Sequence, residues 1–318
     1  MRYLVTGATG FVGGALARQL VAAGHDVRAL VRDPRRAQDL HARGVALFLG
    51  DVTERESLRE PMRQIDGAFH VAAWYKVGAP DKHLAERINV VGTRNVIEVA
   101  RELGVPKIVY TSTLAVFGDT HGALADESYR HHGPFLSEYD RTKWLAHYRV
   151  AEPAAREGAP IVIVQPGVVY GPGDKGPMRP LWTRYLARRP LAIPAGTAFC
   201  WGHVEDTARG HLVAMERGRA GESYIIAGPA HTLVEAFTMA ERITRIRAPR
   251  AVSPSVLRVG AGLLDLVGRD GESLRVMAGT TYLGDSAKAR RELGFEPRTL
   301  EDGLTETLRY EMRLTEGA

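Results

Sequence analysis

The feature that most constrains the fold of this chain is a glycine-rich turn near its N-terminus, at residues 6–13. The apolar run at 3–5 predicts a buried strand before the turn. Apolar residues at three- and four-residue spacing over 11–23 predict an amphipathic helix after it, ending at Gly24. A second strand is expected over 26–31. The chain therefore begins with a strand–helix–strand unit whose glycines lie between the first strand and its helix.

Gly7, Gly10 and Gly13 have the spacing of a dinucleotide-binding turn. Gly7 permits the tight turn, Gly10 lets the backbone approach a pyrophosphate, and Gly13 lets helix and strand pack closely. The pyrophosphate would lie at the helix N-terminus, beside Phe11 and Val12, where unpaired N–H groups and the helix dipole favour negative charge. We predict that these five residues bind a dinucleotide; glycines that serve only a tight turn are the alternative.

The end of the second strand distinguishes NADP from NAD. An NAD site usually carries an acidic residue there, which accepts hydrogen bonds from the ribose 2′-hydroxyl. Here Arg32 follows the strand, and its planar donor fork suits a 2′-phosphate, with Arg35 or Arg36 assisting. We predict a preference for NADP, with NAD as the second choice. In the alternative, Arg32 stacks on adenine or faces solvent while Asp33 serves the ribose.

Further apolar strands at 45–49, 68–71 and 107–110 alternate with helical stretches. This pattern predicts an α/β fold, a doubly wound parallel Rossmann-type sheet with helices on both faces. We assign residues 1–170 to the dinucleotide-binding domain, with a returning segment near 203–228. Residues 171–318 form a smaller, mixed α/β substrate domain.

Ligands of such sheets gather at the carboxyl ends of the strands. Asp51 is expected there to accept from the adenine amino group, with Val52 beside it, although capping of the helix that follows is a competing role. Ala72 and Ala73 are small enough to let the cofactor lie against the backbone. Thr113 ends the strand that precedes the reactive segment.

Tyr139 and Lys143 stand at i and i+4 on a helix predicted to begin near Ser137, and so share one face. A phenol has a pKa near 10, and a neighbouring ammonium lowers that pKa by stabilising the phenolate. Tyr139 could then exchange a proton with a substrate oxygen that the Thr113 hydroxyl holds. A solvated surface pair is the common alternative. The position behind a dinucleotide turn and a strand ending in Thr113 favours the catalytic interpretation.

The chain resembles the extended short-chain dehydrogenase/reductases over nearly all of its length. The matching stretches are residues 6–13, 50–52, 70–73, 89–93, 170–174, 286–295 and 300–304, together with the Tyr139/Lys143 pair. The resemblance implies that Tyr139 is the catalytic acid/base, Lys143 its partner and Thr113 the hydroxyl that binds the substrate oxygen. It also implies a supporting role for Ser112 and a place near the nicotinamide for Pro166.

Within this family the chain is most similar to the dihydroflavonol-4-reductase-like branch, whose NADPH-using pattern matches residues 31–34. Leu114 and Ala115 stand where sugar-nucleotide dehydratases carry an Asp-Glu pair. Residues 200–206 lack the arginine that sugar-nucleotide enzymes use to grip a diphosphate. The prediction is therefore NADPH-dependent reduction of a ketone or aldehyde. A sugar-nucleotide epimerase and a non-catalytic NADP-binding regulatory protein are the alternatives.

The substrate pocket is the least determined part of the site. Aromatic and charged residues that flank strand ends or family insert positions are candidates, and each is otherwise an ordinary packing or surface residue. They are Trp74, Lys76, Phe117 and Trp201, with Tyr75 and His203 as further candidates. A small carbonyl or alcohol compound is the expected substrate.

Composition excludes several classes of partner. The net charge of +5 comes from 36 Arg and six Lys spread along the chain, without the aromatic interleaving of a nucleic-acid surface. The sequence contains no uninterrupted apolar stretch of about 18 residues, so we expect no membrane span. A single cysteine, Cys200, fits a reducing cytoplasm, and no Cys/His cluster predicts a metal site. We expect a cytoplasmic protein and, from the resemblance, a homodimer through helices around 85–103 and 139–157.

Overall fold

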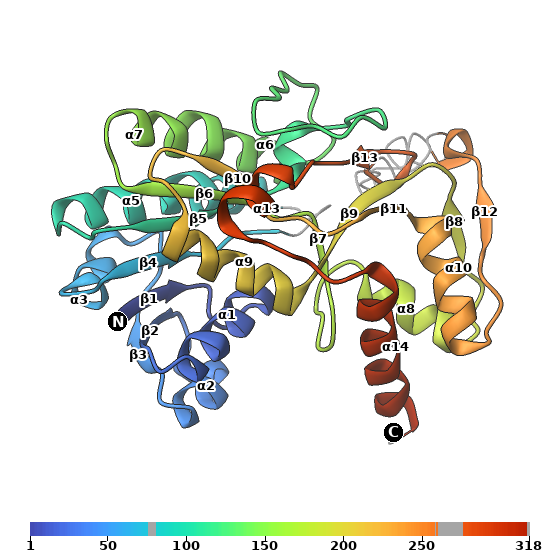
Figure 1. Cartoon of the computed structure of the whole chain (residues 1–318), viewed down its shortest axis with the longest axis horizontal. Helices are drawn as coiled ribbons and strands as arrows, with labels where there is room; N and C mark the ends of the chain where they lie inside the picture. The colour runs from blue at the N-terminus through green and yellow to red at the C-terminus, as the bar shows by residue number, and fades with distance from the viewer. Residues whose placement is uncertain (76–80, 258, 260–275, 317–318) are drawn as a thin grey trace.

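A computed structural model of the chain describes residues 1–75, 81–257, 259 and 276–316. The predicted α/β architecture is confirmed: a parallel sheet of seven strands has helices on both faces, and a smaller mixed region lies beside it (Figure 1). Its strands, in spatial order, are β10 (Ser223–Ile225), β6 (Ile161–Gln165), β5 (Ile108–Thr111), β4 (Gly67–His70), β1 (Arg2–Thr6), β2 (Asp26–Val31) and β3 (Ala46–Leu49).

The two faces of this sheet bury different side chains because residues alternate along each strand. On β5, Val109 packs toward one face, and Ile108 and Tyr110 pack toward the other. The first face is covered by α1 (Phe11–Ala22), α2 (Gln38–Ala42), α9 (Val204–Arg217) and α13 (Ala287–Leu293). The second is covered by α3 (Arg59–Met62), α5 (Gly92–Glu102), α6 (Glu138–Ala146) and α7 (Glu152–Arg156), as Figure 1 shows.

The chain reverses its direction across the sheet between β1 and β4. From β1 it moves outward to β2 and β3, and then returns so that β4 pairs with the other side of β1. In open α/β sheets this switch point is where a crevice forms outside the carboxyl ends of the strands. The glycine turn after β1 and the segment after β4 therefore lie side by side.

The three predicted glycines each meet a different requirement of this packing. Gly7 has φ +75°, and a Cβ on it would lie 2.7 Å from the backbone N of Ala72. A Cβ on Gly13 would lie 2.3 Å from the carbonyl oxygen of Gly7, so only glycine lets α1 approach β1 this closely. Gly10, the residue before α1, has one close neighbour, the Gly7 oxygen at 3.0 Å. The side of Gly10 away from Gly7 is open.

The smaller region has its own aromatic core. It contains a four-stranded sheet of β7 (Val168–Tyr170), β9 (Ala198–His203), β11 (Ala230–Thr232) and β13 (Thr281–Tyr282), and a two-stranded sheet of β8 (Ala192–Pro194) and β12 (Arg250–Val252). Its helices are α8 (Arg179–Leu186), α10 (Leu233–Thr244) and α14 (Leu300–Glu316). Outside this region, a short helix α4 (Lys82–Glu86) precedes α5. Strand β10 returns to the edge of the large sheet beside β6. The assigned domain boundaries stay a prediction.

We expect Gly13→Ala to destabilise the fold, because the new methyl group must push the Gly7 carbonyl away. Overpacking of this kind costs about 1–3 kcal/mol. Gly14→Ala is the matched control: it lies in the same helix, and its nearest neighbour, the Ala8 oxygen, is 3.2 Å from the added Cβ. Urea unfolding of both variants measures the difference. Equal unfolding free energies for the two variants would contradict the packing described here.

Candidate active site

The nucleotide end of the candidate site is a backbone cradle at the N-terminus of α1. The first N–H groups of a helix have no intrahelical acceptor, and no acidic residue lies in the first turn of α1 to compete for them. Gly10 adds no side chain in front of these groups, and the close packing at Gly7 and Gly13 holds the turn and α1 against the ends of β1 and β4. The residues present therefore fit the pyrophosphate of a dinucleotide, held by the backbone beside Phe11 and Val12.

At the end of β2, Arg32 and Asp33 have different surroundings. The Asp33 carboxylate is occupied by Arg35, whose guanidinium donates to it at 2.9 and 3.0 Å. Arg32 is two-thirds exposed, and its Nε lies 3.9 Å from the carboxylate of Asp51, which follows the neighbouring strand β3. Asp33 is thus engaged with its own neighbour, while the Arg32 guanidinium faces solvent at the crevice.

Asp51 and Val52 follow β3. One carboxylate oxygen of Asp51 accepts hydrogen bonds from the backbone N–H and the hydroxyl of Thr53, both at 2.9 Å, and the other faces Arg32. Asp51 therefore stabilises the turn after β3, and its second oxygen is available at the crevice. Val52 is buried against Gly92, so its side chain packs in the core and only its backbone can face a cofactor.

The segment after β4 forms the next part of the crevice wall. The N–H of Ala72 donates to the Thr6 hydroxyl at 3.3 Å, which ties this segment to the end of β1. The Asn89 side chain holds the backbone of Trp74 at both N–H and C=O, at 2.8 and 3.0 Å. Ala73 lies between these two anchors. Lys76 lies outside the described residues.

The predicted catalytic hydroxyls come together at the carboxyl edge of β5. Ser137 caps α6 by accepting from the N–H of Asp140 at 3.0 Å, which places Tyr139 in the first turn of the helix. The Tyr139 hydroxyl lies close to the hydroxyl of Thr113, near enough for Thr113 to lower the Tyr139 pKa, and Thr113 is almost fully buried. Two hydroxyl groups from different elements thus meet at one point, as the reaction predicted from the sequence requires.

Burial has the largest effect on the pKa of Tyr139. Burial, with the Asp140 carboxylate nearby, raises the pKa of Tyr139 to about 12, against the lowering effect of the Thr113 hydroxyl. Among the described contacts, the Lys143 ammonium donates to Tyr110 and Thr111 rather than to Tyr139. In the chain without nucleotide the net shift of the Tyr139 pKa is therefore upward, because desolvation outweighs the effect of Thr113; the lowering predicted from Lys143 together with a bound nicotinamide stays a prediction. The Tyr139 hydroxyl therefore keeps its proton at physiological pH.

Lys143 lies one turn further along α6 and is only 2% exposed. Its Nζ donates to the backbone oxygen of Thr111 at 2.7 Å and to the Tyr110 hydroxyl at 3.3 Å. Burial lowers the pKa of Lys143 to about 7, because desolvation disfavours the charged form. Small changes around this group therefore change how much of it is charged near neutral pH.

Ser112 and Pro166 lie next to the hydroxyl pair. The Ser112 hydroxyl is bonded to the ring of His147 at 2.7 Å, and the residue is buried, so it joins β5 to the segment after α6. The carbonyl of Pro166 accepts from the N–H of Leu114 at 3.0 Å, which joins the end of β6 to the residue after Thr113. Both contacts fix the strand ends that carry the site.

Two predicted substrate residues lie in the core of the smaller region. Phe117 is fully buried, edge to face with Tyr129, and Trp201 is 1% exposed with its Nε1 donating to the carbonyl of His231 at 2.9 Å. The packing gives no support to their prediction as pocket residues, because neither offers surface to a ligand. Trp74 is also largely buried. Their positions next to strand ends made these aromatic residues candidates. The sequence does not show whether such a side chain lines a pocket or packs in the core.

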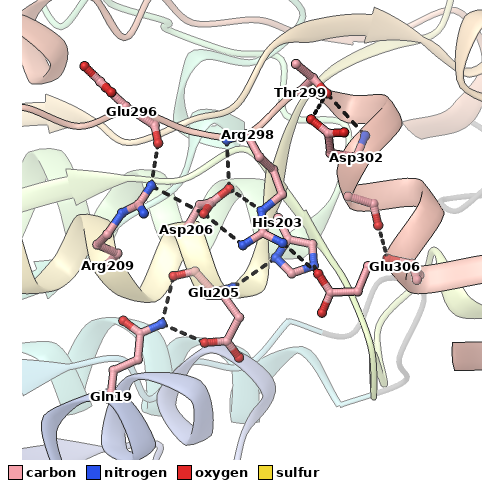
Figure 2. Close-up of polar contacts among 12 residues, drawn as sticks. Gln19, His203, Glu205, Asp206, Arg209, Glu296, Arg298, Thr299, Asp302 and Glu306 are labelled. Atoms are coloured by element: carbon pink, nitrogen blue, oxygen red, sulfur yellow. Dashed lines mark hydrogen bonds and ion pairs between the residues drawn. The ribbon is translucent and has the colours of Figure 1, made fainter. Parts of the chain in front are cut away.

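His203, a further pocket candidate, belongs to a polar cluster where the two regions meet (Figure 2). Its ring caps α9 by accepting from the N–H of Glu205 at 3.4 Å. In the same cluster Asp206 accepts from the backbone and the guanidinium of Arg298, both at 2.9 Å, and Arg298 also donates to Glu306 at 2.7 Å. These contacts join α9 to the segment that leads into α14, and so have a structural role.

Behind Lys143 lie buried polar residues that were not predicted from the sequence. Tyr110, Thr93 and His70 are each 1% exposed, yet their polar atoms contact one another and the Lys143 ammonium. His70 and Thr93 were noticed only as part of family motifs. The alternation of β5 could have indicated Tyr110, since it places that side chain on the face that α6 covers.

Over the described ranges, no three His, Cys, Asp or Glu side chains gather in an arrangement that could hold a metal ion. In the same part of the chain, no helix has the length and apolar character needed to cross a bilayer.

Comparison with known proteins gives the family. The model of the NAD dependent epimerase/dehydratase family matches residues 3–227. A Synechocystis sp. protein provisionally named a dihydroflavonol 4-reductase is 33% identical, over 97% of this chain and 94% of its own. A Stigmatella aurantiaca protein named 4-hydroxy-2-methyl-3-oxo-4-farnesyl-3,4-dihydroquinoline-1-oxide ketoreductase is 32% identical, over 96% and 95%.

Among solved structures, a nucleoside-diphosphate-sugar epimerase from Pseudomonas aeruginosa superposes with a TM-score of 0.82 at 26% identity, covering 99% of this chain and 98% of the other. The matches agree on a nicotinamide cofactor and on an oxidoreductase or epimerase. They divide between reductases and sugar-nucleotide enzymes in the reaction. The chain belongs to the NAD dependent epimerase/dehydratase family, within the extended short-chain dehydrogenase/reductases.

Proposed function

We propose that this protein reduces a ketone or aldehyde with NADPH. The observation that carries the proposal is the neutral Tyr139 hydroxyl, close to that of Thr113 at the carboxyl edge of the sheet. Because Tyr139 is protonated at physiological pH, it has a proton to give to the substrate oxygen, as reduction requires. The reductase names of the relatives at 33% and 32% identity support the same direction.

In this reaction the nicotinamide, when bound, supplies a hydride to the carbonyl carbon. Thr113 and Tyr139 bind the carbonyl oxygen through their hydroxyls, which draws electrons toward that oxygen. As negative charge develops on the oxygen, Tyr139 donates its proton to it and the alcohol forms. The positive charge of Lys143, one turn away, stabilises the phenolate that remains, and a proton from solvent restores the phenol.

The preference for NADPH rests on the end of β2. Because Arg35 occupies Asp33, that carboxylate is a poor acceptor for a ribose hydroxyl. The exposed guanidinium of Arg32 is free of a short ion pair and would bind a 2′-phosphate.

A sugar-nucleotide epimerase is the second candidate, which the Pseudomonas structure supports. Against it stands the composition of β9, at the positions where sugar-nucleotide enzymes carry the diphosphate-binding arginine. Cys200 and Trp201 lie there, both buried in the core, so neither can grip a diphosphate. The two candidates also differ in what they do with the nucleotide: an epimerase retains it through each turnover, and a reductase consumes NADPH.

We expect purified protein to oxidise NADPH in the presence of some members of a panel of ketones and aldehydes. Tyr139→Phe should lower that rate about 10²–10⁴-fold, because it removes the proton donor. Tyr148→Phe is the matched control, since Tyr148 lies after the same helix and its hydroxyl donates to the carbonyl of Tyr129, at 3.4 Å. Loss of absorbance at the NADPH band measures both. A Tyr139→Phe variant as fast as the parent protein would exclude the mechanism, and tightly retained nucleotide without NADPH consumption would favour the epimerase.

Arg32→Ala should lower kcat/KM for NADPH about 10–100-fold while changing kcat/KM for NADH little, because a charge-assisted pair with the 2′-phosphate is lost. The control is Arg43→Ala, an exposed arginine after α2. The measured quantity is the ratio of the two kcat/KM values. An unchanged ratio in the Arg32 variant would show that another group reads the 2′ position.

Reduction should slow as pH rises above the Lys143 pKa, which is about 7 in the chain alone. The rate falls with rising pH because the protonated form of Lys143 is the active one. Below this pKa Lys143 is an ammonium, and above it the charge that stabilises the phenolate is lost. Tyr139 keeps its proton throughout the accessible range. The test is the pH profile of kcat/KM for the carbonyl compound between about pH 5.5 and 9. A rate that increases across this interval would contradict the assignment.

A further inference from the structure

Lys143 is a buried cation, and its described contacts that stabilise the charge are neutral polar groups and an aromatic ring. In the described parts of the chain its Nζ forms no ion pair within 4.0 Å of a carboxylate, and its described contacts are the Thr111 oxygen, the Tyr110 hydroxyl and the Tyr110 ring, whose centroid is 4.9 Å away. An ammonium has three N–H donors. The Thr111 oxygen and the Tyr110 hydroxyl, both on β5, accept two of these N–H groups. The third N–H group is left for the side of Tyr139 and the crevice. These two acceptors on β5 therefore hold the ammonium in place.

The Tyr110 hydroxyl is itself held by a buried group of side chains. Thr93, on α5, contacts this hydroxyl, and the Thr93 oxygen also lies 3.1 Å from Nε2 of His70, on β4. On its other side, Nδ1 of His70 lies 2.8 Å from the Thr6 hydroxyl. Four residues from β1, β4, α5 and β5 thus form one continuous row that ends at Lys143.

The donors in this row can be assigned by elimination. Thr93 gives its single proton to the carbonyl of Asn89 at 2.6 Å, so it can only accept from His70 and Tyr110. His70 therefore carries its proton on Nε2, and its Nδ1 accepts from Thr6. Burial lowers the pKa of His70 to about 3, which keeps the ring neutral as this assignment requires. Tyr110 then donates to Thr93 and accepts from Lys143.

This direction has a chemical consequence. The proton of Thr93 ends at a backbone carbonyl, which cannot pass it on, so the row does not carry protons away from Lys143. What the row provides is a fixed acceptor: the Tyr110 oxygen points its lone pair at the ammonium because its proton is engaged elsewhere. The Tyr110 hydroxyl cannot rotate to offer its proton to Lys143 without breaking the bond to Thr93.

We propose that Tyr110 is a positioning residue for Lys143: its hydroxyl, oriented by Thr93 and His70, fixes the ammonium beside Tyr139 and favours its charged form. This inference rests on the proposed reductase function. Other titratable groups near Lys143 are His70 from β4 and His147 from the segment after α6, and Tyr139 lies one turn earlier on its own helix. None of them is a carboxylate, so the Tyr110 hydroxyl is an important part of the compensation.

Tyr110→Phe tests this directly, because it removes the hydroxyl and keeps the ring over Nζ. Losing a hydrogen bond to a charged group should shift the titration of Lys143 downward by about one pH unit. In the protein without nucleotide or substrate, the pH dependence of Lys143 acetylation by trace acetic anhydride, followed by peptide mass spectrometry, reports that titration. The Lys143 amine should become reactive at lower pH than in the parent protein.

The same shift should appear in catalysis. At about pH 8 we expect Tyr110→Phe to lower kcat/KM for reduction about tenfold, with most of the loss recovered at about pH 6, where the ammonium is again populated. A role limited to packing would lower the rate equally at every pH.

Tyr224→Phe is a matched control. Tyr224 is a fully buried tyrosine on β10 of the same sheet, with the Nζ of Lys288 4.7 Å from its ring centroid. Its hydroxyl bonds to Glu292, and Lys288 is paired with Glu222, so this pair has carboxylate partners and is independent of the site. The acetylation profile of Lys143 and the pH profile of reduction should both stay as in the parent protein.

A second pair of variants covers the case in which Tyr110→Phe does not fold. Thr93→Val removes the group that orients Tyr110 and should move both profiles in the same direction, and Thr93→Ser should restore them. Unchanged acetylation profiles in folded Tyr110→Phe and Thr93→Val proteins would overturn the proposal. Because acetylation needs no turnover, it decides the question even if no carbonyl compound is reduced, an outcome that would count against the proposed function alone.

Discussion

The close approach of two backbone segments, the glycine turn after β1 and the chain after β4, determines where the functional groups of this protein lie. Gly7 packs against the backbone of Ala72, and Gly13 packs against Gly7, with no room for a methyl group at either position. This contact brings the N-terminus of α1 to the switch point of the sheet. The Thr6 hydroxyl lies at the same place, so the cofactor cradle and the buried row that reaches Lys143 begin at neighbouring residues.

The family accounts for the fold and the cofactor class, but the reaction depends on a few side chains. By the family resemblance, reductases and sugar-nucleotide epimerases share this fold and the Tyr/Lys pair, which here lies on α6, and they differ in how they bind the substrate and in whether the nucleotide leaves. In this chain the residues on which our proposal of a reductase rests are Cys200 and Trp201, both buried on β9, and the exposed Arg32. Fold similarity alone therefore does not choose between these reactions.

Much of this arrangement could be predicted from the sequence, because the relevant signals are local. Glycine spacing between a strand and a helix determined the turn, and i, i+4 spacing placed Tyr139 and Lys143 on one face. The remainder depends on contacts between distant residues. No local pattern shows that Arg35 occupies Asp33, that Trp201 packs inward, or that desolvation raises the Tyr139 pKa. The residues predicted to bind cofactor and substrate, the homodimer and the cytoplasmic location stay predictions.

The cluster in Figure 2 has a consequence for how this chain folds. Leu293 and Phe295 complete the core beneath the large sheet, and Leu304 and Leu308 on α14 complete the core of the smaller region. Arg298, between them, is anchored to Asp206. One short stretch of chain thus finishes both cores, so the two regions should melt as one cooperative unit. During synthesis, neither can reach its native packing until this stretch has emerged from the ribosome.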